Sequence, residues 1–316
     1  MTLLLVQLLN GLQLGVLLFL IAAGLTLVFG VLDVINLAHG VQYMAGAYLA
    51  VLGAQWTGSF WWGLLLAAVV SGGIGLGLNA AVFRPLRGRD HLDPVLATFG
   101  LTLLFEEGAR TLFGPAPLGM ALPPGLAGTV GLPGGLQYPV YRLALLGAGL
   151  GVAAVLWAVI ERTRAGMLVR AAASDAPVLG ALGVDVGRVF AGVLGAGGLL
   201  AGFAGAAAAP LISVEPGMGG NVLILAFVVV VVGGVGSVRG AFVAALLVGL
   251  CDTLGRGYAT ELLRAVLSPS AARMAGPALA SMSIYVLMAG VLAWRPGGLA
   301  GGLAGGLAGG AAGGRA

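Results

Sequence analysis

The sequence predicts an all-α fold, a polytopic helical bundle that spans a membrane. Of its 316 residues 59% are hydrophobic and only 8% are charged, with a mean hydropathy of +1.08. An ordinary soluble protein carries roughly 25% charged residues, so this chain has too few to cover a soluble surface. Its 58 glycines lie mostly inside apolar runs, which favours close helix packing in lipid.

The apolar runs predict eight to nine membrane segments, because a hydrocarbon core of ~30 Å needs about 20 residues per helix. The runs cover residues 3–31, 37–56, 61–83, 94–113, 140–160, 189–210, 221–236, 241–255 and 277–294. Those at 221–236 and 241–255 are short for a full crossing, which makes them candidates for broken or re-entrant helices. We expect a single transmembrane domain over residues 1–296 and a flexible, Gly/Ala-rich cytoplasmic tail over residues 297–316.

The loop charges predict the orientation. Arginines gather in residues 84–89 and again in residues 162–188. The positive-inside rule places both loops in the cytoplasm, and the two spans between them agree with this. The Pro/Gly-rich loop 114–139 carries no charge and is expected outside, as is the N-terminus.

The chain has no lysine, since all 15 basic residues are arginines. A P-loop needs its lysine to reach the nucleotide phosphates, so any ATP used must be hydrolysed by another chain. We therefore expect a protein that is not an enzyme and has no cofactor. No Cys/His cluster supports a metal site, because His39 and His91 lie apart and Cys251 is the single cysteine. No run of arginines resembles a nucleic-acid patch.

Charges inside the apolar runs form pairs at helical spacing. Glu106 and Glu107 precede Arg110 by four and three residues, and Asp252 precedes Arg256 by four. Neighbours at this spacing neutralise one another. The pattern favours ion pairs near the lipid headgroups; a relay for a transported ion is the alternative.

A polar break interrupts the first two apolar runs at GVLDVINLAHG. Asp33, Asn36 and His39 lie here, bracketed by Gly30 and Gly40. One interpretation is a broken helix inside the membrane beside a substrate route, where irregular backbone is tolerated. The other is a tight turn at the cytoplasmic surface, with Asp33 capping a helix.

A second break lies in VVVVVGGVGSVRGAF, where Gly233, Gly234 and Gly236 interrupt a run of valines. Backbone flexibility and close helix packing would each explain these glycines. Ser237 is not expected to be a hydrolase nucleophile, because the motif lacks a following glycine and a placed histidine.

The loop 161–188 is predicted to form short amphipathic helices over residues 166–182. An exposed apolar patch on a cytoplasmic loop is typical of a protein partner. With the missing P-loop, this suggests a docking site for a separate ATPase. A helix that only packs on the membrane surface is the alternative.

Four segments together resemble a known family. They are GLTLVFGVLDVINLAHGVQYMAGAYLA, FRPLRGRDHLDPVLATFGLTLLF, RTRAGMLVRAAASDAPVLGALGVDVGRVFAGVLGAGGLLAGFAGA and AFVVVVVGGVGSVRGAFVAALLVGL. In this order, over residues 11–255, they resemble the LivH-type inner-membrane permease of branched-chain amino acid ABC importers.

The resemblance implies a multi-pass permease of the bacterial inner membrane that imports branched-chain or related hydrophobic amino acids. It implies four kinds of partner: a second related permease, two cytoplasmic ATPase subunits, an extracytoplasmic substrate-binding protein and membrane lipid. Residues matching the ATPase-contacting loop are Arg170, Ala171, Ala172, Asp175, Leu182 and Gly183. Residues expected to flank the substrate path are Asp33, Asn36, His39, Gly40, Gly233, Gly234 and Gly236.

The sequence leaves two other functions open. An ABC permease for a sugar, nucleoside, urea or amide would share this composition and loop plan. A secondary transporter or channel would work without any ATPase.

Overall fold

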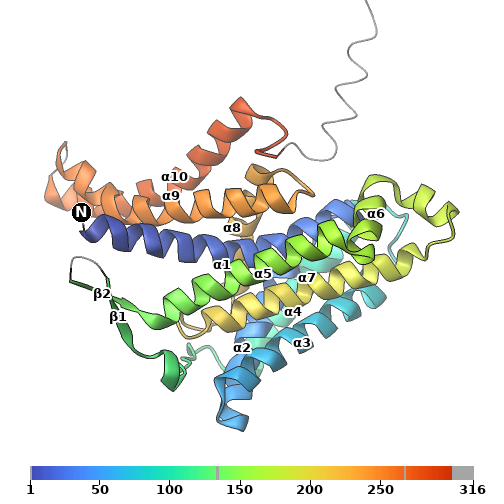
Figure 1. Cartoon of the computed structure of the whole chain (residues 1–316), viewed down its shortest axis with the longest axis horizontal. Coiled ribbons are helices and arrows are strands. Elements are labelled where there is room, and N and C mark those ends of the chain that lie inside the picture. Colours follow the sequence, from blue (N-terminus) through green and yellow to red (C-terminus); the bar gives the residue numbers. More distant parts are fainter. Residues whose placement is uncertain (1, 133–134, 267, 301–316) are drawn as a thin grey trace, which may run out of the picture. The chain divides into compact units, whose positions relative to one another are not determined.

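The structure is a computed structural model that describes residues 2–132, 135–266 and 268–300. It is almost entirely helical (Figure 1). The helices are α1 (Thr2–Leu32), α2 (His39–Thr57), α3 (Phe60–Leu78), α4 (Leu92–Phe113), α5 (Val140–Arg162), α6 (Arg164–Ala181), α7 (Val186–Ala208), α8 (Met218–Gly233), α9 (Val238–Arg264) and α10 (Pro269–Trp294). A π-turn (Asn79–Phe83) extends α3, and a short 3-10 turn (Pro124–Leu126) precedes two strands.

The predicted fold class is confirmed, and each of the nine apolar runs lies in or largely within a helix. Within the described residues, six helices are long and apolar enough to cross a membrane: α1, α3 with its π-turn, α5, α7, α9 and α10. The run at 241–255 belongs to a helix of 27 residues, longer than predicted. Charged residues in the C-terminal part of this helix lower its hydropathy. They form ion pairs along the helix surface, so the helix continues through them.

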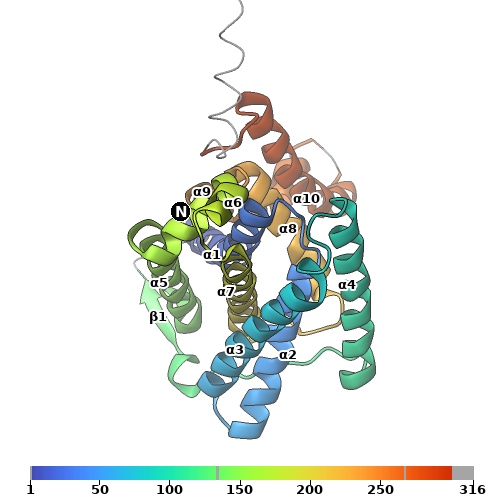
Figure 2. The same ribbon diagram turned by 90° about the vertical axis from the view of Figure 1, so that its right-hand side faces the viewer.

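The chain divides into two compact units, which we describe separately. The first, the α2–α3–α7 unit, comprises Leu20–Pro124 and Val152–Phe227. In it α2, α3 and α7 pack against one another (Figure 2). Glycines permit the close approach: a Cβ on Gly53 would lie 2.8 Å from the Cα of Gly63, and one on Gly24 would lie 2.8 Å from the carbonyl oxygen of Gly197. This backbone-to-backbone packing is typical of membrane helices.

Two apolar clusters mark opposite ends of this unit. One contains Val31 of α1, Phe83 of the π-turn, Leu179 of α6 and Phe190 of α7. The basic loops 84–89 and 162–188 both leave from this end, which agrees with placing them on one side of the membrane. The guanidinium of Arg87 also lies 4.5 Å from the ring centre of Phe190.

The second cluster contains Ala50 of α2, Ala67 of α3 and Ala206 of α7, with Met120 of the uncharged loop packed against it. The loop after α4 also pairs with the segment after α7 through a β-bridge between Leu118 and Val214. The loop predicted to lie outside is therefore at the opposite end from the arginines.

The second unit, the α9–α10 unit, comprises residues 1–19, 125–151 and 228–316. The first half of α1 packs on α9 through Gly11 and Gly15, where a Cβ on Gly11 would lie 2.9 Å from the Cα of Leu250. The rings of Phe19 and Phe242 meet edge to face with centroids 5.1 Å apart. Helices α9 and α10 pack along each other.

A small β-hairpin in this unit was not predicted. Strand β1 (Thr129–Leu132) pairs antiparallel with β2 (Leu136–Pro139) in the Pro/Gly-rich loop. The Tyr138 hydroxyl and the Arg142 Nη1 both donate to the Oδ1 of Asn10, at 3.0 and 2.6 Å. The Tyr138 hydroxyl is protonated at neutral pH and can donate, and burial raises its pKa further. These bonds fix the start of α5 to α1.

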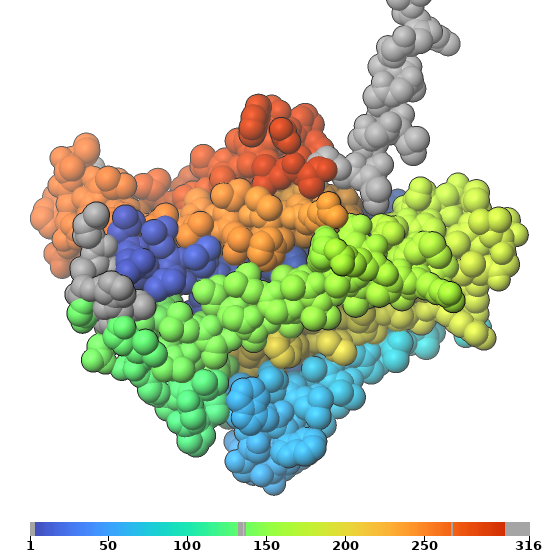
Figure 3. All heavy atoms as spheres, in the orientation of Figure 1, coloured from blue at the N-terminus to red at the C-terminus, as the bar shows by residue number. Residues whose placement is uncertain are grey.

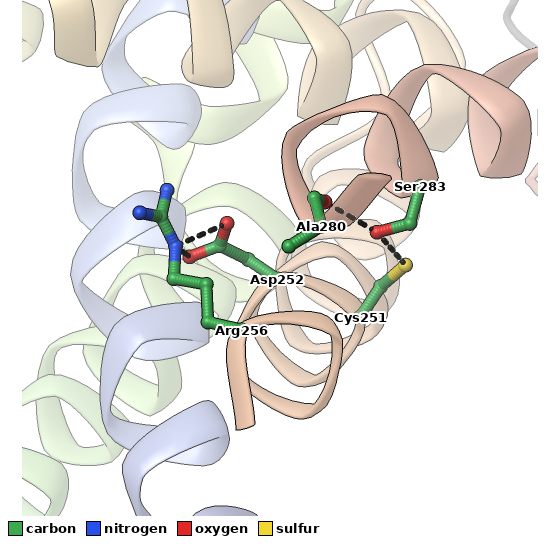
Figure 4. A network of polar contacts seen from close by, with 5 residues as sticks. All are labelled: Cys251, Asp252, Arg256, Ala280 and Ser283. Atoms are coloured by element: carbon green, nitrogen blue, oxygen red, sulfur yellow. Dashed lines mark hydrogen bonds and ion pairs between the residues drawn. The ribbon is translucent and has the colours of Figure 1, made fainter. Parts of the chain in front are cut away.

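Two of the charged pairs expected from the sequence are present, Asp252–Arg256 and Glu107–Arg110. The Arg256 Nε donates to both carboxylate oxygens of Asp252 at 2.9 Å, as Figure 4 shows. Asp252 is buried, whereas the Arg256 side chain is mostly exposed. Arg110 lies 3.8 Å from Glu107, and both are exposed. This geometry agrees with structural ion pairs.

Candidate functional site

The connection between α1 and α2 divides into an exposed half and a buried half. The backbone of Asp33 is left-handed, with φ of 52°, and its N–H donates to the carbonyl oxygen of Phe29 at 2.9 Å. Asp33 therefore ends α1 through its backbone, and it is exposed. Asn36, His39 and Gly40 are buried. The motif thus contains residues in two different environments.

Helix α2 begins part-way along α1 and not at its end. The Nε2 of His39 donates to the carbonyl oxygen of Ile21 at 3.0 Å. Ile21 lies 11 residues before Leu32, the last residue of α1, which is about 16 Å along the axis at 1.5 Å per residue. The Leu37 N–H donates to the Thr98 hydroxyl of α4 at 3.3 Å. This geometry favours the broken-helix interpretation of the segment over the surface turn.

Gly40 lies where α2 meets α8. A Cβ on Gly40 would lie 2.9 Å from the carbonyl carbon of Gly219, and one on Gly219 would lie 2.7 Å from that of Gly40. Any side chain at either position would push the two backbones apart. Gly40 therefore has a packing role beside His39, and its place on a substrate path stays a prediction.

The glycines of the second break form a capped turn in the α9–α10 unit. Gly233 ends α8, Gly234 and Gly236 have φ of 95° and 78°, and the Ser237 hydroxyl accepts from Gly240 N at 3.0 Å to start α9. Two further bonds come from the end of the described chain: Leu299 N donates to the carbonyl oxygen of Val232 at 2.9 Å, and Ala300 N to that of Gly233 at 3.2 Å. The role of these glycines in the path stays a prediction.

The segment 161–188, predicted to be cytoplasmic, contains α6, which is two short helices in sequence. The Thr163 hydroxyl caps its start by accepting from Gly166 N at 3.1 Å. At Asp175 the backbone leaves the helical region, with φ of −156° and ψ of 92°. The Asp175 carboxylate then accepts from Val178 N at 2.9 Å, which is the geometry of a new helix start. The predicted short amphipathic helices are confirmed.

The predicted contact residues lie on different faces of this segment. Ala172 and Leu179 are buried in the apolar cluster at the arginine-bearing end, and Ala171 is half-buried. Arg170, Asp175, Leu182 and Gly183 are exposed. Three apolar side chains, Met167, Val178 and Leu182, are 54%, 54% and 76% exposed. Figure 3 shows atoms of α6 on the surface of the drawn face.

One polar residue beside the break was missed from the sequence. Gln42 is fully buried and lies one turn after His39. A lone amide three residues after a polar motif, inside an apolar run, is the signal that could have marked it.

Comparison with known proteins identifies the family of this helical bundle. The family described as the branched-chain amino acid transport system / permease component matches residues 7–292. The chain belongs to this permease family. It is accordingly a multi-pass protein of the bacterial inner membrane.

Curated relatives cover most of the chain. It is 30% identical over 269 residues to the high-affinity branched-chain amino acid transport system permease protein BraD of Pseudomonas aeruginosa, covering 79% of this chain and 85% of the relative. It is 28% identical over 286 residues to the permease protein LivH of Escherichia coli K12, covering 83% and 89%. LivH of Salmonella typhimurium is 28% identical over 284 residues, with the same coverage. No solved structure shows significant similarity to the chain.

Proposed function

We propose that this chain is the membrane-spanning permease subunit of an ABC importer that moves branched-chain or related hydrophobic amino acids into the cytoplasm. Separate ATPase subunits power it. The observation that carries the proposal is α6, an exposed, interrupted amphipathic segment at the arginine-bearing end of a chain without lysine. Such a chain cannot build a P-loop, so it needs a surface through which another chain's ATP cycle acts.

The second part of α6 has the features of a rigid contact element. Its buried side packs through Leu179 into the apolar cluster with the ends of α1, α3 and α7. Its exposed side presents Val178 and Leu182, and the Asp175 cap fixes its direction. A push on this element would therefore be transmitted to several membrane helices at once, because packed interiors deform little.

Our proposals for the remaining partners and for the substrate rest on membership of the family. Relatives named as branched-chain amino acid transport permeases support an amino acid substrate. We propose a second related permease beside this chain, two ATPase subunits on α6 and its counterpart, and an extracytoplasmic binding protein that delivers the amino acid. No catalysis is assigned to this chain itself.

Co-purification in mild detergent tests the assembly. We expect two ATPase subunits and a second permease to accompany the unmodified chain. Changing Val178 and Leu182 together to Asp should greatly reduce recovery of the ATPases. Val266→Asp is the matched control, since Val266 is 84% exposed in the connection between α9 and α10, which we expect outside. Equal loss in both variants would contradict α6 as the docking site.

Uptake into proteoliposomes tests the transport reaction. The assembled complex should take up labelled leucine only with ATP and the binding protein, and unlabelled valine should compete. Competition by ribose, a nucleoside, urea or an amide in place of valine would show that the chain is an ABC permease for that other class of solute. Uptake by this chain without ATPase subunits would instead identify a secondary transporter or channel.

A further inference from the structure

A band of uncharged polar side chains lies buried around the start of α2 in the α2–α3–α7 unit. We call it the polar seam; its members are Asn36, His39, Gln42, Ser71 and Asn79. Asn79 is 8% exposed and the other four are fully buried. Because His39 lies beside Ile21, His39 and Gln42 are well away from the end of α1, whereas Asn79 lies nearer the apolar cluster at that end. His39 and Gln42 therefore lie at a depth where polar groups are expensive and usually functional.

Gln42 lies at the centre of the seam, where α2, α3 and α7 meet. A Cβ on Gly75 of α3 would lie 3.2 Å from the Gln42 Nε2, and a Cβ on Gly198 of α7 would lie 2.9 Å from it. The Ser71 hydroxyl donates to the backbone carbonyl oxygen of Gln42 at 3.3 Å. Ser71, Gly75 and Asn79 follow one another at intervals of four residues, so they share the face of α3 that meets α2.

Most side-chain polar atoms of the seam lack a partner. Within the described residues, both polar atoms of Asn36 and Gln42, the Nδ1 of His39 and the Oδ1 of Asn79 have no hydrogen bond of ordinary geometry. The Gln42 side chain lies against the His39 ring, close enough for a hydrogen bond between them, so Asn36 and Asn79 carry the clearest unpaired atoms. Folded proteins pair nearly all buried polar groups, so a concentration of this kind needs an explanation.

We infer that the polar seam is the part of the transport path that receives the charged head group of the amino acid, and that this structure shows the seam closed. The inference rests on the proposed transport function. The amide and imidazole groups offer both donors and acceptors, which an ammonium and a carboxylate each require. Being neutral, they hold a zwitterion weakly enough to release it, as a transport path requires.

The start of α2 adds a second contribution. The first N–H groups of a helix carry partial positive charge, and the N-cap residue Ala38 supplies no side-chain cap. Discontinuous helices in transporters use such ends to face anionic substrate groups. With the unpaired Asn36 side chain and the polar side chains of His39 and Gln42 beside it, this end is suited to the substrate carboxylate.

The seam is also where separating α2 from α3 and α7 should cost the least free energy. Parting it would break the bond from Ser71 to Gln42 but would let water and substrate reach atoms that are unpaired when it is closed. The apolar cluster of Ala50, Ala67 and Ala206 further along α2 offers no such compensation. Opening should therefore be confined to the first half of α2.

Cysteine labelling in the full complex tests whether the seam opens. In a Cys251→Ser background, Gln42→Cys should react with a membrane-impermeant methanethiosulfonate ammonium reagent at least tenfold faster during ATP turnover than without ATP. Saturating leucine should slow the reaction. Ala50→Cys, a fully buried position on the same helix, is the control and should stay unreactive in both states. An unreactive Gln42→Cys in a complex that still assembles and hydrolyses ATP would overturn the inference.

Gln42→Leu provides a second measurement that does not depend on reagent access. Removing a buried amide that has no hydrogen bond of ordinary geometry should leave the unfolding temperature equal to or above that of the unmodified chain, while leucine uptake falls about tenfold or more. A purely structural glutamine would give the opposite result, with lower thermal stability and uptake lost only in proportion to folded protein.

The two proposals fail in different ways. If the unmodified complex shows no ATP-dependent uptake of any amino acid, the proposed function is refuted, and with it the inference. Suppose instead that the unmodified complex takes up leucine normally, Gln42→Cys is unreactive and Gln42→Leu transports at the unmodified rate. The proposed function then stands, and only the inference about the seam is refuted.

Discussion

Three glycines of one helix should respond in opposite directions to the same substitution. Gly75 of α3 lies against α7, where an added Cβ would come within 2.9 Å of the Leu194 carbonyl carbon and still closer to its oxygen. At Gly73 and Gly77 an added Cβ would meet nothing within 4 Å. We therefore expect Gly75→Ala to destabilise the protein, and Gly73→Ala and Gly77→Ala to stabilise it.

The magnitude follows from the contact distance. Non-bonded carbon atoms pack best at about 3.5–4.0 Å, so α3 and α7 would have to move apart by roughly 0.6–1 Å to accept a methyl group at Gly75. Overpacking of this kind typically costs about 1–3 kcal/mol. Alanine gains about 0.5–1 kcal/mol over glycine inside any helix. That gain is common to all three variants, so Gly75→Ala should be less stable than either control by about 1–3 kcal/mol.

Reversible denaturation of the purified protein in detergent measures this difference. The free energy of unfolding of each variant is compared with that of the unmodified chain under identical conditions. Gly73→Ala and Gly77→Ala also report whether helix propensity operates in this environment. If Gly75→Ala were as stable as the controls, the close approach of α3 and α7 would be refuted.

Three further predictions concern the other parts of the chain. Asp175→Ala removes the cap in the middle of α6, which should cost about 1 kcal/mol locally and reduce ATPase recovery in co-purification. Arg256→Gln leaves the buried Asp252 carboxylate without its partner, and denaturation should show a loss of about 1–3 kcal/mol. Removing residues 297–316 deletes two backbone bonds to the end of α8, and the same assay should show a loss of about 1–3 kcal/mol in total.

Each of these three has a matched comparison. Arg264→Gln breaks an exposed pair with Glu261 and should cost less than about 1 kcal/mol, so an equal loss in Arg256→Gln would contradict the buried-carboxylate argument. Removing only residues 301–316 retains both bonds to α8, so this chain should be more stable than the one that lacks residues 297–316. Asp185→Ala removes a similar cap from α7 and should not reduce ATPase recovery as strongly as Asp175→Ala.

The helices could be predicted from the sequence because lipid imposes a simple rule of length and polarity on each segment. The interruption of α6 was also within reach, since Asp175 and Pro177 are poor residues for a helix interior. The β-hairpin at Thr129–Pro139 was missed because its glycines and prolines are typical of irregular loops. Its register depends on pairing across the chain, which local composition does not reveal.

The polar seam could be predicted only in part. Asn36 and His39 stand out among apolar neighbours, but Gln42 and Asn79 look like isolated polar residues until α3 is placed beside α2. Their common environment comes from helix packing through Gly75 and Gly198, and small-residue contacts leave no distinctive sequence period in a chain with 58 glycines. Tertiary structure was therefore necessary to bring these residues together.

The length of the break between α1 and α2 explains why Asp33 and His39 occupy different environments. The chain leaves α1 at Leu32 and must reach Ile21, about 16 Å back along the same helix. The seven residue steps from Leu32 to His39 span at most about 23–25 Å when extended, and the left-handed turn at Asp33 uses part of that length to reverse direction. The length of the link therefore limits how far the start of α2 can lie from the end of α1. A polar helix start at this depth is thus a consequence of the spacing between Asp33 and His39, with the reversal at the exposed end and the unpartnered side chains at the buried one.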